Sequence, residues 1–325
     1  MTSFTRFSRG SDAGASRSAP AGGIRLHDAG PEIIRPVLPP LLRSLRPVQW
    51  AKNLFVLPPL VFSGSLQDPV AVVRIGLTFL LFCGLSSSIY LLNDLVDRQR
   101  DRLHPLKRHR PLAAGTLSVP VAVVTMVALA AGGLIGSALL GPRVLAASGA
   151  FLLLNLLYSA WLKHVVIVDV MSIAAGYVIR VLAGGAAIAV PVSQWLLLCA
   201  TFLALFLAFS KRRHELELLR GEAAGQREVL LHYGREFLDQ MINVVTASTV
   251  IAYALYTTDA ETTGKYGSPY YVLTIPFALF GIFRYLYLTY QADDPRNPTE
   301  TMLTDVPFLV NLVLWGSTVL AIIYT

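Results

Sequence analysis

The chain has 325 residues, of which 54% are hydrophobic and 14% are charged, with a net charge of +7 and a mean hydropathy of +0.57. Soluble domains carry roughly 25% charged residues. The composition therefore excludes a soluble enzyme, a secreted disulfide scaffold and a disordered chain, and it indicates an integral membrane protein. Cys83 and Cys199 lie in apolar runs without neighbouring ligands, and we assign them no metal site.

Residues 1–46 are rich in Gly, Ala, Ser, Pro and Arg and lack the apolar stretch of a secretory signal. They are predicted to form a disordered, basic cytoplasmic arm that is attracted to the membrane surface. Residues 47–325 are expected to form a single transmembrane domain.

The second part of the chain contains nine apolar segments close to the length of about 20 residues that a membrane-spanning helix needs. They cover residues 49–66, 72–92, 119–140, 143–161, 165–188, 193–210, 241–257, 269–290 and 306–324. The sequence therefore predicts an all-α integral membrane protein with nine transmembrane helices.

The distribution of basic residues predicts the orientation. With nine spans and an inside N-terminus, the inside loops carry 22 of the 27 lysines and arginines. Such an excess is typical of cytoplasmic loops. The positive charge is thereby explained by topology, and it gives no reason to expect nucleic acid as a partner.

Three carboxylates follow the second span. Asp94, Asp97 and Asp101 are spaced three and four residues apart, so on a continuing helix they fall within about 60° of one another. Clustered carboxylates repel one another, and a divalent cation is the best compensation. The spacing favours Mg²⁺ that binds a diphosphate. The alternative is a solvated helix end, at which the acids pair with neighbouring arginines.

A run of basic and imidazole side chains comes next, between Pro105 and Pro111. It contains Lys107, Arg108 and Arg110. These cations could simply mark the cytoplasmic side, but beside the carboxylates they favour phosphate binding.

The segment from Asn93 to Gly115 reads Asn-Asp-x-x-Asp-x-x-x-Asp followed by His-Pro-x-Lys-Arg-x-Arg-Pro-x-Ala-x-Gly. These two motifs resemble those of the UbiA superfamily of intramembrane prenyltransferases. The resemblance implies helices around a central cavity, Mg²⁺ at the first motif (here called the Asp motif, Asn93 to Asp101), and a lateral opening for a polyprenyl chain.

The loop after the sixth span departs from the usual family pattern. Family members that use a prenyl diphosphate carry a second Asp-rich motif there, whereas this chain has Lys211, Arg212 and Arg213, and its first Asp in this loop is Asp239. Fixed cations can neutralise phosphate directly. The site is therefore expected to take a ligand with more phosphate and fewer metals.

The pattern Lys-Arg-x-x-Glu-Leu, which ends with Glu215 and Leu216, resembles the branch of the superfamily that transfers phosphoribose to decaprenyl phosphate. Further matches to this branch are Gln49-Trp50-x-Lys52-Asn53, Tyr158 to His164, Asp169, and Arg180 with Gly184-Gly185. The resemblance implies substrate-binding residues at Asn93, Lys52, Lys107, Arg108, Arg110, Tyr158, Lys163, Asp169, Arg180, Lys211, Arg212 and Glu215.

Two of these assignments have structural alternatives. A charged residue within a span is costly, so Arg180 is expected to be functional or paired, and Asp169 is the candidate partner. Ala183, Gly184 and Gly185 would let helices approach closely. Lys52 could be no more than an interfacial anchor.

The leading interpretation is an Mg²⁺-dependent transferase in a bacterial plasma membrane, with a cytoplasmic active site in the transmembrane domain. It would move 5-phosphoribose from phosphoribosyl diphosphate to a polyprenyl phosphate, with catalytic roles for Asp94, Asp97 and Asp101. The first alternative is an aromatic prenyltransferase that uses a prenyl diphosphate. The second is a transporter of anionic lipids, in which Arg180 and Arg284 line a path. A homo-oligomer is compatible with all three.

Overall fold

The computed structural model describes residues 39–104, 107–219, 232–260, 262, 264, 269–291, 302 and 304–324, and these residues contain helices and no strands. Most of the predicted basic arm lies outside the described residues. Its last part does not, and Pro40–Leu45 form a short helix, α1. Helix α1 packs against α3 (Pro69–Val96) and α5 (Pro111–Ala114), so the compact unit begins before residue 47.

Eight helices in the described part of the chain are long and apolar enough to cross a membrane. They comprise α3 (Pro69–Val96), α6 (Val119–Leu140), α7 (Pro142–Ala160), α8 (Val168–Ala187), α9 (Gln194–Leu219), α10 (Arg235–Thr258), α12 (Ile275–Gln291), which continues the 3₁₀ helix η6 (Pro269–Thr274), and α14 (Val306–Tyr324). Each coincides with one of the predicted spans from the second to the ninth. The multi-pass α-helical architecture is confirmed, while the count of nine is not.

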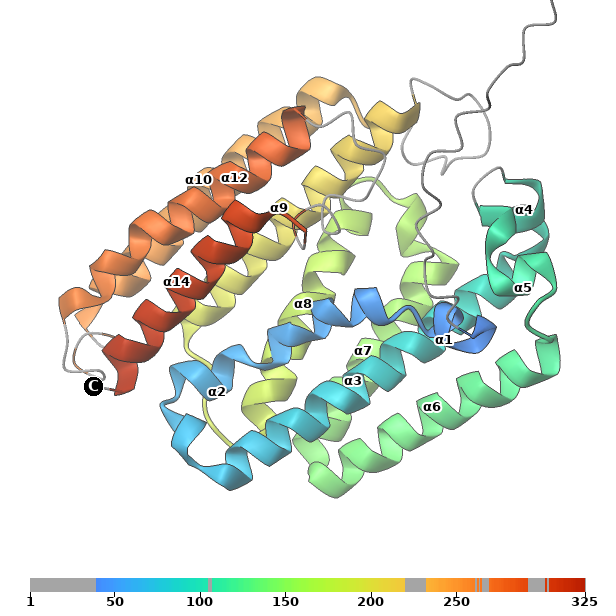
Figure 1. The fold of residues 1–325 in the computed structure, drawn as a ribbon, viewed down its shortest axis with the longest axis horizontal. Coiled ribbons are helices and arrows are strands. Elements are labelled where there is room, and N and C mark those ends of the chain that lie inside the picture. Colours follow the sequence, from blue (N-terminus) through green and yellow to red (C-terminus); the bar gives the residue numbers. More distant parts are fainter. Residues whose placement is uncertain are drawn as a thin grey trace, which may run out of the picture. The chain divides into compact units, whose positions relative to one another are not determined.

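The first predicted span, 49–66, is broken. It consists of the 3₁₀ helix η1 (Pro47–Val56), the short helix α2 (Pro58–Phe62) and the 3₁₀ turn η2 (Ser65–Gln67). Pro58 and Pro59 interrupt it, because proline lacks the backbone N–H that an α-helix requires. Hydropathy alone does not register this break. The broken segment still runs beside α3 and α8, in the direction opposite to α3 (Figure 1).

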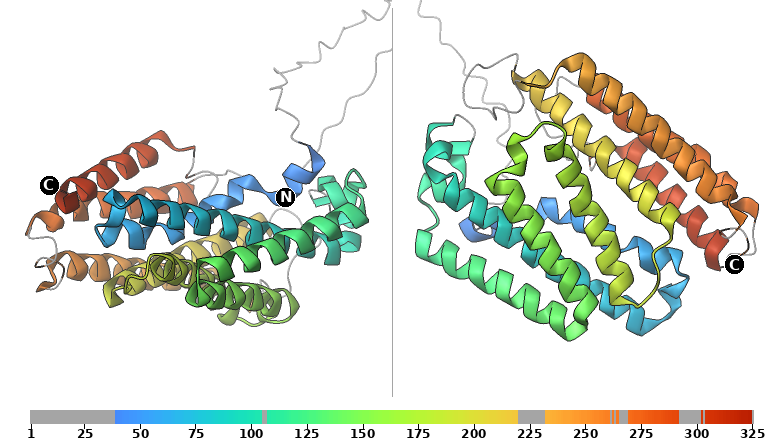
Figure 2. Two further views of the ribbon diagram at one scale, coloured as in Figure 1. Left: turned by 90° about the horizontal axis from the view of Figure 1, so that it is seen from below. Right: turned by 180° about the vertical axis from the view of Figure 1, so that it is seen from behind.

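Consecutive long helices pack side by side. Helices α6, α7, α8, α9 and α10 contact one another in chain order, and they follow one another across the view from behind (Figure 2). Helix α3 packs on α6, and α12 packs on α14. The segment η1–α2 crosses in front of α8 (Figure 1), and η1 packs against both α3 and α8.

The close approach of η1 to α8 depends on a glycine. A Cβ atom at Gly184 would overlap the carbonyl oxygen of Val56. A Cβ at Gly185 would likewise crowd Val192. The expectation that small residues here allow close packing is therefore confirmed.

Arg74 joins three helices near the N-terminal end of α3. Its guanidinium donates to the carbonyl oxygen of Ala187 at 2.5 Å and to that of Leu140 at 2.6 Å. These two residues end α8 and α6, where carbonyl groups lack intrahelical partners. Arg74 thus satisfies the C-terminal ends of two helices at once.

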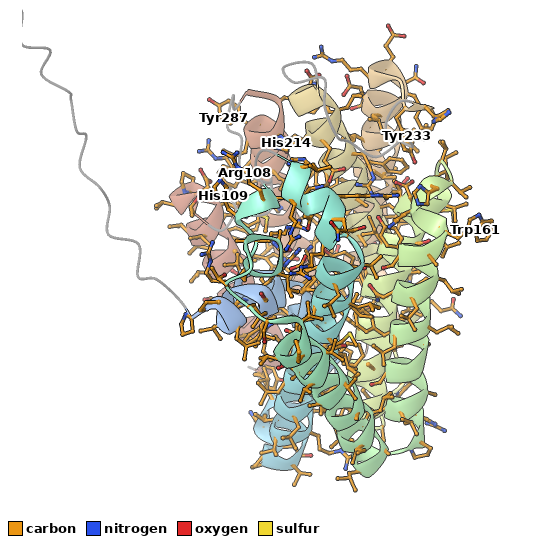
Figure 3. The ribbon with its side chains drawn as sticks, turned by 90° about the vertical axis from the view of Figure 1, so that its right-hand side faces the viewer. Arg108, His109, Trp161, His214, Tyr233 and Tyr287 are labelled. Atoms are coloured by element: carbon orange, nitrogen blue, oxygen red, sulfur yellow. The ribbon has the colours of Figure 1, made fainter. Side chains whose placement is uncertain are left out.

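The Asp motif and the C-terminal residues lie at opposite ends of the helices. Arg108, His109, His214 and Tyr233 lie at one end of the helices (Figure 3), which is the end that carries the Asp motif. At the other end, the hydroxyl of Tyr324 accepts a hydrogen bond from the backbone N–H of Leu66 at 3.0 Å. The last described residue therefore lies at the end opposite to the Asp motif.

The arrangement predicts which ends of α3 are accessible from each side of the membrane. In a chain with Leu103→Cys, an impermeant maleimide should label the new thiol only after the cells are broken, because the excess of basic residues predicts that the Asp-motif end lies inside. Gln67→Cys should be labelled in intact cells. Both positions are exposed. The unmodified chain, with its two native thiols, gives the background labelling. Labelling of Leu103→Cys in intact cells would show that the orientation is opposite to the predicted one.

The packing at Gly184 predicts a stability effect. Gly184→Ala should lower the free energy of unfolding by about 1 to 3 kcal/mol or more, because η1 must move away from α8. Thermal unfolding in detergent measures this. Gly149→Ala in α7 is the matched control, since a Cβ there meets no atom within 4 Å and alanine favours the helix. Equal unfolding temperatures for the two variants would contradict the packing argument.

Candidate active site

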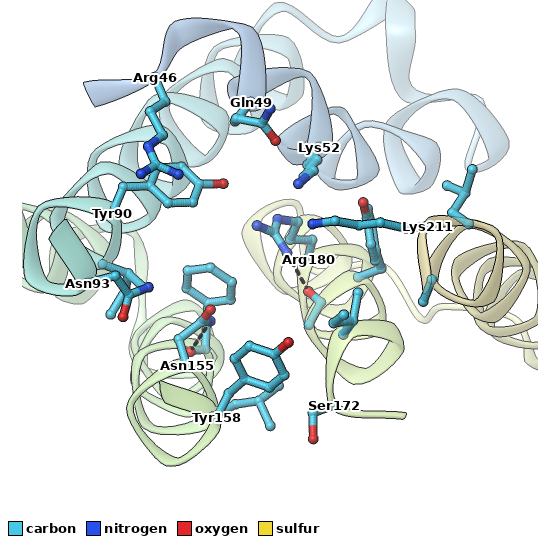
Figure 4. Close-up of a pocket in the computed structure, with 18 of the residues that line it drawn as sticks. Arg46, Gln49, Lys52, Tyr90, Asn93, Asn155, Tyr158, Ser172, Arg180 and Lys211 are labelled. Atoms are coloured by element: carbon cyan, nitrogen blue, oxygen red, sulfur yellow. Dashed lines mark hydrogen bonds between the residues drawn. The ribbon is translucent and has the colours of Figure 1, made fainter. Parts of the chain in front are cut away.

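A cavity of about 500 Å³ lies between η1, α3, α7, α8 and α9 (Figure 4). Six lysine and arginine side chains line it, namely Arg46, Lys52, Lys107, Arg110, Arg180 and Lys211. Glu215 is the one carboxylate among the described lining residues, and Tyr90, Asn93, His104, Asn155 and Tyr158 add polar groups. The cavity is therefore strongly cationic.

The Asp motif borders this cavity through arginines. Asp94, near the end of α3, is only 2% exposed and pairs with Arg46 at 2.5 Å and with Arg110 at 3.1 Å. Nitrogen Nη1 of Arg110 also contacts Asp101 at 2.8 Å. Asp97 separates α3 from the short helix α4 (Arg98–Leu103), and no partner is recorded for its side chain in the described part of the chain.

The alternative of a solvated helix end does not describe Asp94 and Asp101. Both are buried, and their partners come from outside the motif. Arg98 and Arg102 donate instead to the carbonyl oxygens of Leu112 and Ala113 in α5 (Pro111–Ala114). Arg98 and Arg102 thus hold the following segment in place, and that segment carries Arg110 back to the carboxylates.

The carboxylates suit a hard divalent cation. No cluster of three or more acidic, His or Cys side chains with metal-binding geometry is found among the described residues. Arg110 nevertheless places a positive group between Asp94 and Asp101, which shows that these two buried carboxylates converge on one cation. Carboxylate oxygens are the donors that Mg²⁺ prefers, one or two at a time with water and phosphate. The residues present therefore fit Mg²⁺.

Arg180 lies on α8 and reaches into the cavity, with 7% of its surface exposed (Figure 4). Its guanidinium donates to neutral acceptors, which are Asn53 Oδ1 at 2.7 Å, the Gly176 carbonyl at 2.9 Å and Ser86 Oγ at 3.4 Å. The rings of Phe151 and Tyr177 also lie within 6 Å of it. No carboxylate pairs with Arg180 among the described residues, so its charge is available to an anion in the cavity.

The alternative pairing of Arg180 with Asp169 is wrong. Oxygen Oδ2 of Asp169 accepts a hydrogen bond from Arg212 Nε at 2.6 Å, and Oδ1 accepts one from the Tyr233 hydroxyl, also at 2.6 Å. Burial raises the pKa of Tyr233 above its ordinary value, and the hydrogen bond to Asp169 adds to this, so the hydroxyl stays protonated and keeps donating.

Arg212 and Asp169 are both fully buried and neither lines the cavity. The two remaining nitrogens of Arg212 bind Glu215 Oε2 at 2.6 Å and the Tyr158 hydroxyl at 2.9 Å. The structure therefore separates Arg212 from Lys211, which does line the cavity. Arg212 orients two lining residues and does not face the ligand space itself.

Two other predicted residues lie away from the cavity. Arg108 is exposed, with its guanidinium 3.4 Å from His109 Nε2, and Lys163 sits in the short turn η4 (Leu162–His164) after α7. Neither is among the lining residues. Both belong to segments in which basic residues are expected to set the orientation of the chain.

Arg46 and Ser159 are functional candidates that the sequence analysis missed. Arg46 contacts Asp94 across 48 positions and has a backbone φ of 55°, an uncommon value for a non-glycine residue. Ser159 donates to Asn93 Oδ1 at 2.7 Å and so joins α7 to the Asp motif. The neighbouring motif residues Gln49 and Trp50 were the available signal for Arg46, and the matched segment Tyr158 to His164, which contains Ser159, was the signal for Ser159.

A second, apolar cavity of about 440 Å³ lies between η1, α2, α9, α10, α12 and α14. Its lining includes Phe55, Leu203, Phe206, Tyr285 and Trp315. Leu207 on α9 lines both cavities and forms part of the wall between them.

Arg284, on α12, pairs with Asp305 at 2.8 Å, and this contact lowers the pKa of Asp305.

Comparison with known proteins identifies the family. The sequence model of the UbiA prenyltransferase family matches residues 56–313. A decaprenyl-phosphate phosphoribosyltransferase of Mycolicibacterium smegmatis is 34% identical over 295 residues, which cover 87% of this chain and 92% of the relative. One from Corynebacterium glutamicum is 32% identical over 290 residues, which cover 87% of this chain and 86% of the relative.

Solved structures agree with this assignment at the level of the fold. A UbiA homolog from Archaeoglobus fulgidus bound to GPP and Mg²⁺ superposes with a TM-score of 0.63 at 24% identity, over 88% of this chain and 100% of that one. The apo structure of a homolog from Aeropyrum pernix gives a TM-score of 0.61 at 16% identity, over 83% and 97%. The protein belongs to the UbiA prenyltransferase family.

Proposed function

We propose that this protein transfers 5-phosphoribose from phosphoribosyl diphosphate to a polyprenyl phosphate such as decaprenyl phosphate, and releases diphosphate. The carrying observation is the cationic cavity, in which Arg180 is buried without a carboxylate partner among the described residues. A donor with two phosphorylated ends and a phosphate acceptor bring more negative charge than one prenyl diphosphate. The names of the relatives from Mycolicibacterium smegmatis and Corynebacterium glutamicum support the same activity.

The diphosphate end of the donor belongs beside the Asp motif. Mg²⁺, held there by Asp94, Asp101 or Asp97, would supply positive charge to the departing diphosphate. Arg46 and Arg110, which line the cavity and contact the motif, are placed to hold the remaining phosphate oxygens. Lys107 and Asn93 lie close to the Asp motif in the chain and also line this cavity.

The acceptor is proposed to span both cavities. Its hydrocarbon chain suits the apolar cavity, and its phosphate suits the wall near Leu207, from which Lys211 lies one helical turn away. Lys52 and Arg180 point toward the same region of the polar cavity (Figure 4). An oxygen of the acceptor phosphate then attacks the anomeric carbon while the bond from that carbon to the diphosphate breaks.

This reaction needs no strong general base, because the acceptor phosphate is already an anion at neutral pH. The barrier lies in the departure of diphosphate and in the positive charge that develops on the sugar. Preorganised cations around the leaving group address the first of these. The active site is proposed to face the cytoplasm of a bacterial plasma membrane, where phosphoribosyl diphosphate is dissolved.

The direct test uses protein in detergent with Mg²⁺, polyprenyl phosphate and labelled phosphoribosyl diphosphate, and follows label into the lipid phase. Transfer should stop in EDTA and return with added Mg²⁺. Asp94→Asn should lose at least about a hundredfold in kcat/KM, because charge stabilisation by a metal is worth several kcal/mol. Asp68→Asn, at the other end of α3, is the matched control, since asparagine also caps helices.

Two outcomes would contradict the proposal. If the label stays in the aqueous phase under all of these conditions, the protein does not transfer phosphoribose to the lipid. Prenylation of an aromatic acceptor by a prenyl diphosphate, with phosphoribosyl diphosphate inert, would favour the aromatic prenyltransferase. Full activity in excess EDTA would contradict only the assigned role of Mg²⁺ and not the transfer reaction.

Lys211 and Arg212 should behave differently although they are adjacent. Lys211→Ala should raise the KM of the lipid acceptor by about tenfold to a hundredfold, with the unfolding temperature unchanged, because a charged contact with the acceptor phosphate is lost. Arg212→Ala leaves the buried carboxylate of Asp169 without its cation, and should cost about 3 to 5 kcal/mol of stability.

Thermal unfolding and steady-state kinetics on both variants separate the two roles. Arg212→Lys should recover little of the lost stability, because lysine cannot contact Asp169, Glu215 and Tyr158 at once. A stable Arg212→Ala protein with a raised KM would instead place Arg212 at the ligand.

A further inference from the structure

Tyr177 on α8 lies at the boundary between the two cavities. Its side chain lines the polar cavity, and the centroid of its ring is 4.6 Å from that of Phe55, which lines the apolar cavity. Leu207, which lines both cavities, belongs to the same boundary. A ligand that occupies both cavities would therefore change from apolar to polar close to Tyr177.

The hydroxyl of Tyr177 has no hydrogen-bond partner among the described residues, although only 7% of the residue is exposed. Buried polar groups in proteins are nearly always hydrogen-bonded, because an unpaired one costs free energy. A phenolic hydroxyl can donate one hydrogen bond. Because Tyr177 lines the polar cavity, a ligand there can supply the acceptor that the protein does not.

Arg180, about one turn further along α8, adds positive charge beside this hydroxyl. Its guanidinium carbon lies 5.6 Å from the centroid of the Tyr177 ring. A guanidinium has five N–H donors, and the recorded contacts with Asn53, Gly176 and Ser86 account for three of them. The hydroxyl and the remaining N–H groups together form a set of donors that suits the oxygens of a phosphate.

The position of Tyr177 along α8 indicates which phosphate this is. Asp169, near the start of α8, binds Tyr233, which lies at the end of the molecule that carries the Asp motif (Figure 3). Tyr177 comes eight residues later, about 12 Å further along the helix axis. The diphosphate of the donor is proposed to lie beside the Asp motif, whereas Tyr177 contacts a residue of the apolar cavity. A phosphate at Tyr177 is therefore the one that carries a hydrocarbon chain.

We propose that the hydroxyl of Tyr177 donates a hydrogen bond to the phosphate of the polyprenyl phosphate acceptor and, together with Arg180, positions this phosphate where the two cavities meet. The inference rests on the proposed function and names a residue that binds its acceptor. It also gives the site a means to distinguish a lipid phosphate from the corresponding lipid alcohol.

The test is Tyr177→Phe, which keeps the ring beside Phe55 and Arg180 and removes only the hydroxyl. Steady-state kinetics should show the KM of polyprenyl phosphate raised about tenfold to a hundredfold, because a hydrogen bond to a charged acceptor is lost. The KM of phosphoribosyl diphosphate and the unfolding temperature in detergent should stay unchanged.

A polyprenol of the same chain length separates binding of the phosphate from packing of the hydrocarbon chain. As a competitive inhibitor against polyprenyl phosphate, it should bind equally well to the wild type and to Tyr177→Phe, because it carries no phosphate. If the hydroxyl of Tyr177 served only to shape the cavity wall, its removal would weaken the binding of both lipids alike.

Tyr287 offers a matched control for the loss of a tyrosine hydroxyl. It lies on α12, is 50% exposed and is not among the described residues that line either cavity. Tyr287→Phe should therefore keep both wild-type KM values. An unchanged lipid KM in Tyr177→Phe, a raised KM of phosphoribosyl diphosphate in its place, or an equal loss of polyprenol binding would overturn the inference.

Failure of this inference is distinguishable from failure of the proposed function. If the wild type moves label from phosphoribosyl diphosphate to the lipid while Tyr177→Phe keeps the wild-type lipid KM, only the role of Tyr177 is wrong. If the wild type moves no label, the proposed function fails and this inference fails with it.

Discussion

The ion pair between Asp169 and Arg212 organises the polar end of the molecule. Both side chains are fully buried, so each would be very costly without the other. Their remaining hydrogen bonds reach Tyr158 on α7 and Tyr233 before α10. One pair of charges thus fixes α7, α8, α9 and the start of α10 relative to one another, and the cavity wall is built on these elements.

The described arginines differ in whether carboxylates of the protein neutralise them, and Arg46 and Arg110 combine a carboxylate partner with a place in the cavity wall. Arg212, Arg213 and Arg284 are neutralised by carboxylates of the protein, and their work is structural. Arg180 contacts only neutral acceptors and aromatic rings among the described residues, and it opens onto the cavity. This buried charge without a carboxylate partner among the described residues is what supports the proposal of an anionic ligand.

Much of the fold followed from the sequence because the lipid environment admits few solutions. A span needs about 20 apolar residues in a helix, and the predicted segments at 119–140 and 306–324 coincide with α6 and α14. Hydropathy did not reveal the break at Pro58 and Pro59, since proline is compatible with an apolar average while it removes backbone hydrogen bonds.

The candidate site was less accessible to sequence reasoning. The motifs placed Lys52, Arg110, Glu215 and their neighbours in one functional group, and the structure brings many of them to one cavity. A sequence gives the charge of Arg212 but not the 0% exposure of its side chain, and the pairing of Arg46 with Asp94 spans 48 positions. Partners that are distant in the chain decide whether a cation serves the fold or the ligand.

Arg74 has a consequence for how charge counts are converted into orientation. Such counts treat each arginine as a full positive charge that resists crossing the membrane. Each helix C-terminus carries roughly half a negative charge, and Arg74 binds the ends of both α6 and α8. The local sum is therefore near zero. The positive charge of Arg74 is thus largely neutralised by the two helix ends that it crosslinks. Its position on the side opposite to the basic loops therefore does not oppose the orientation that those loops favour.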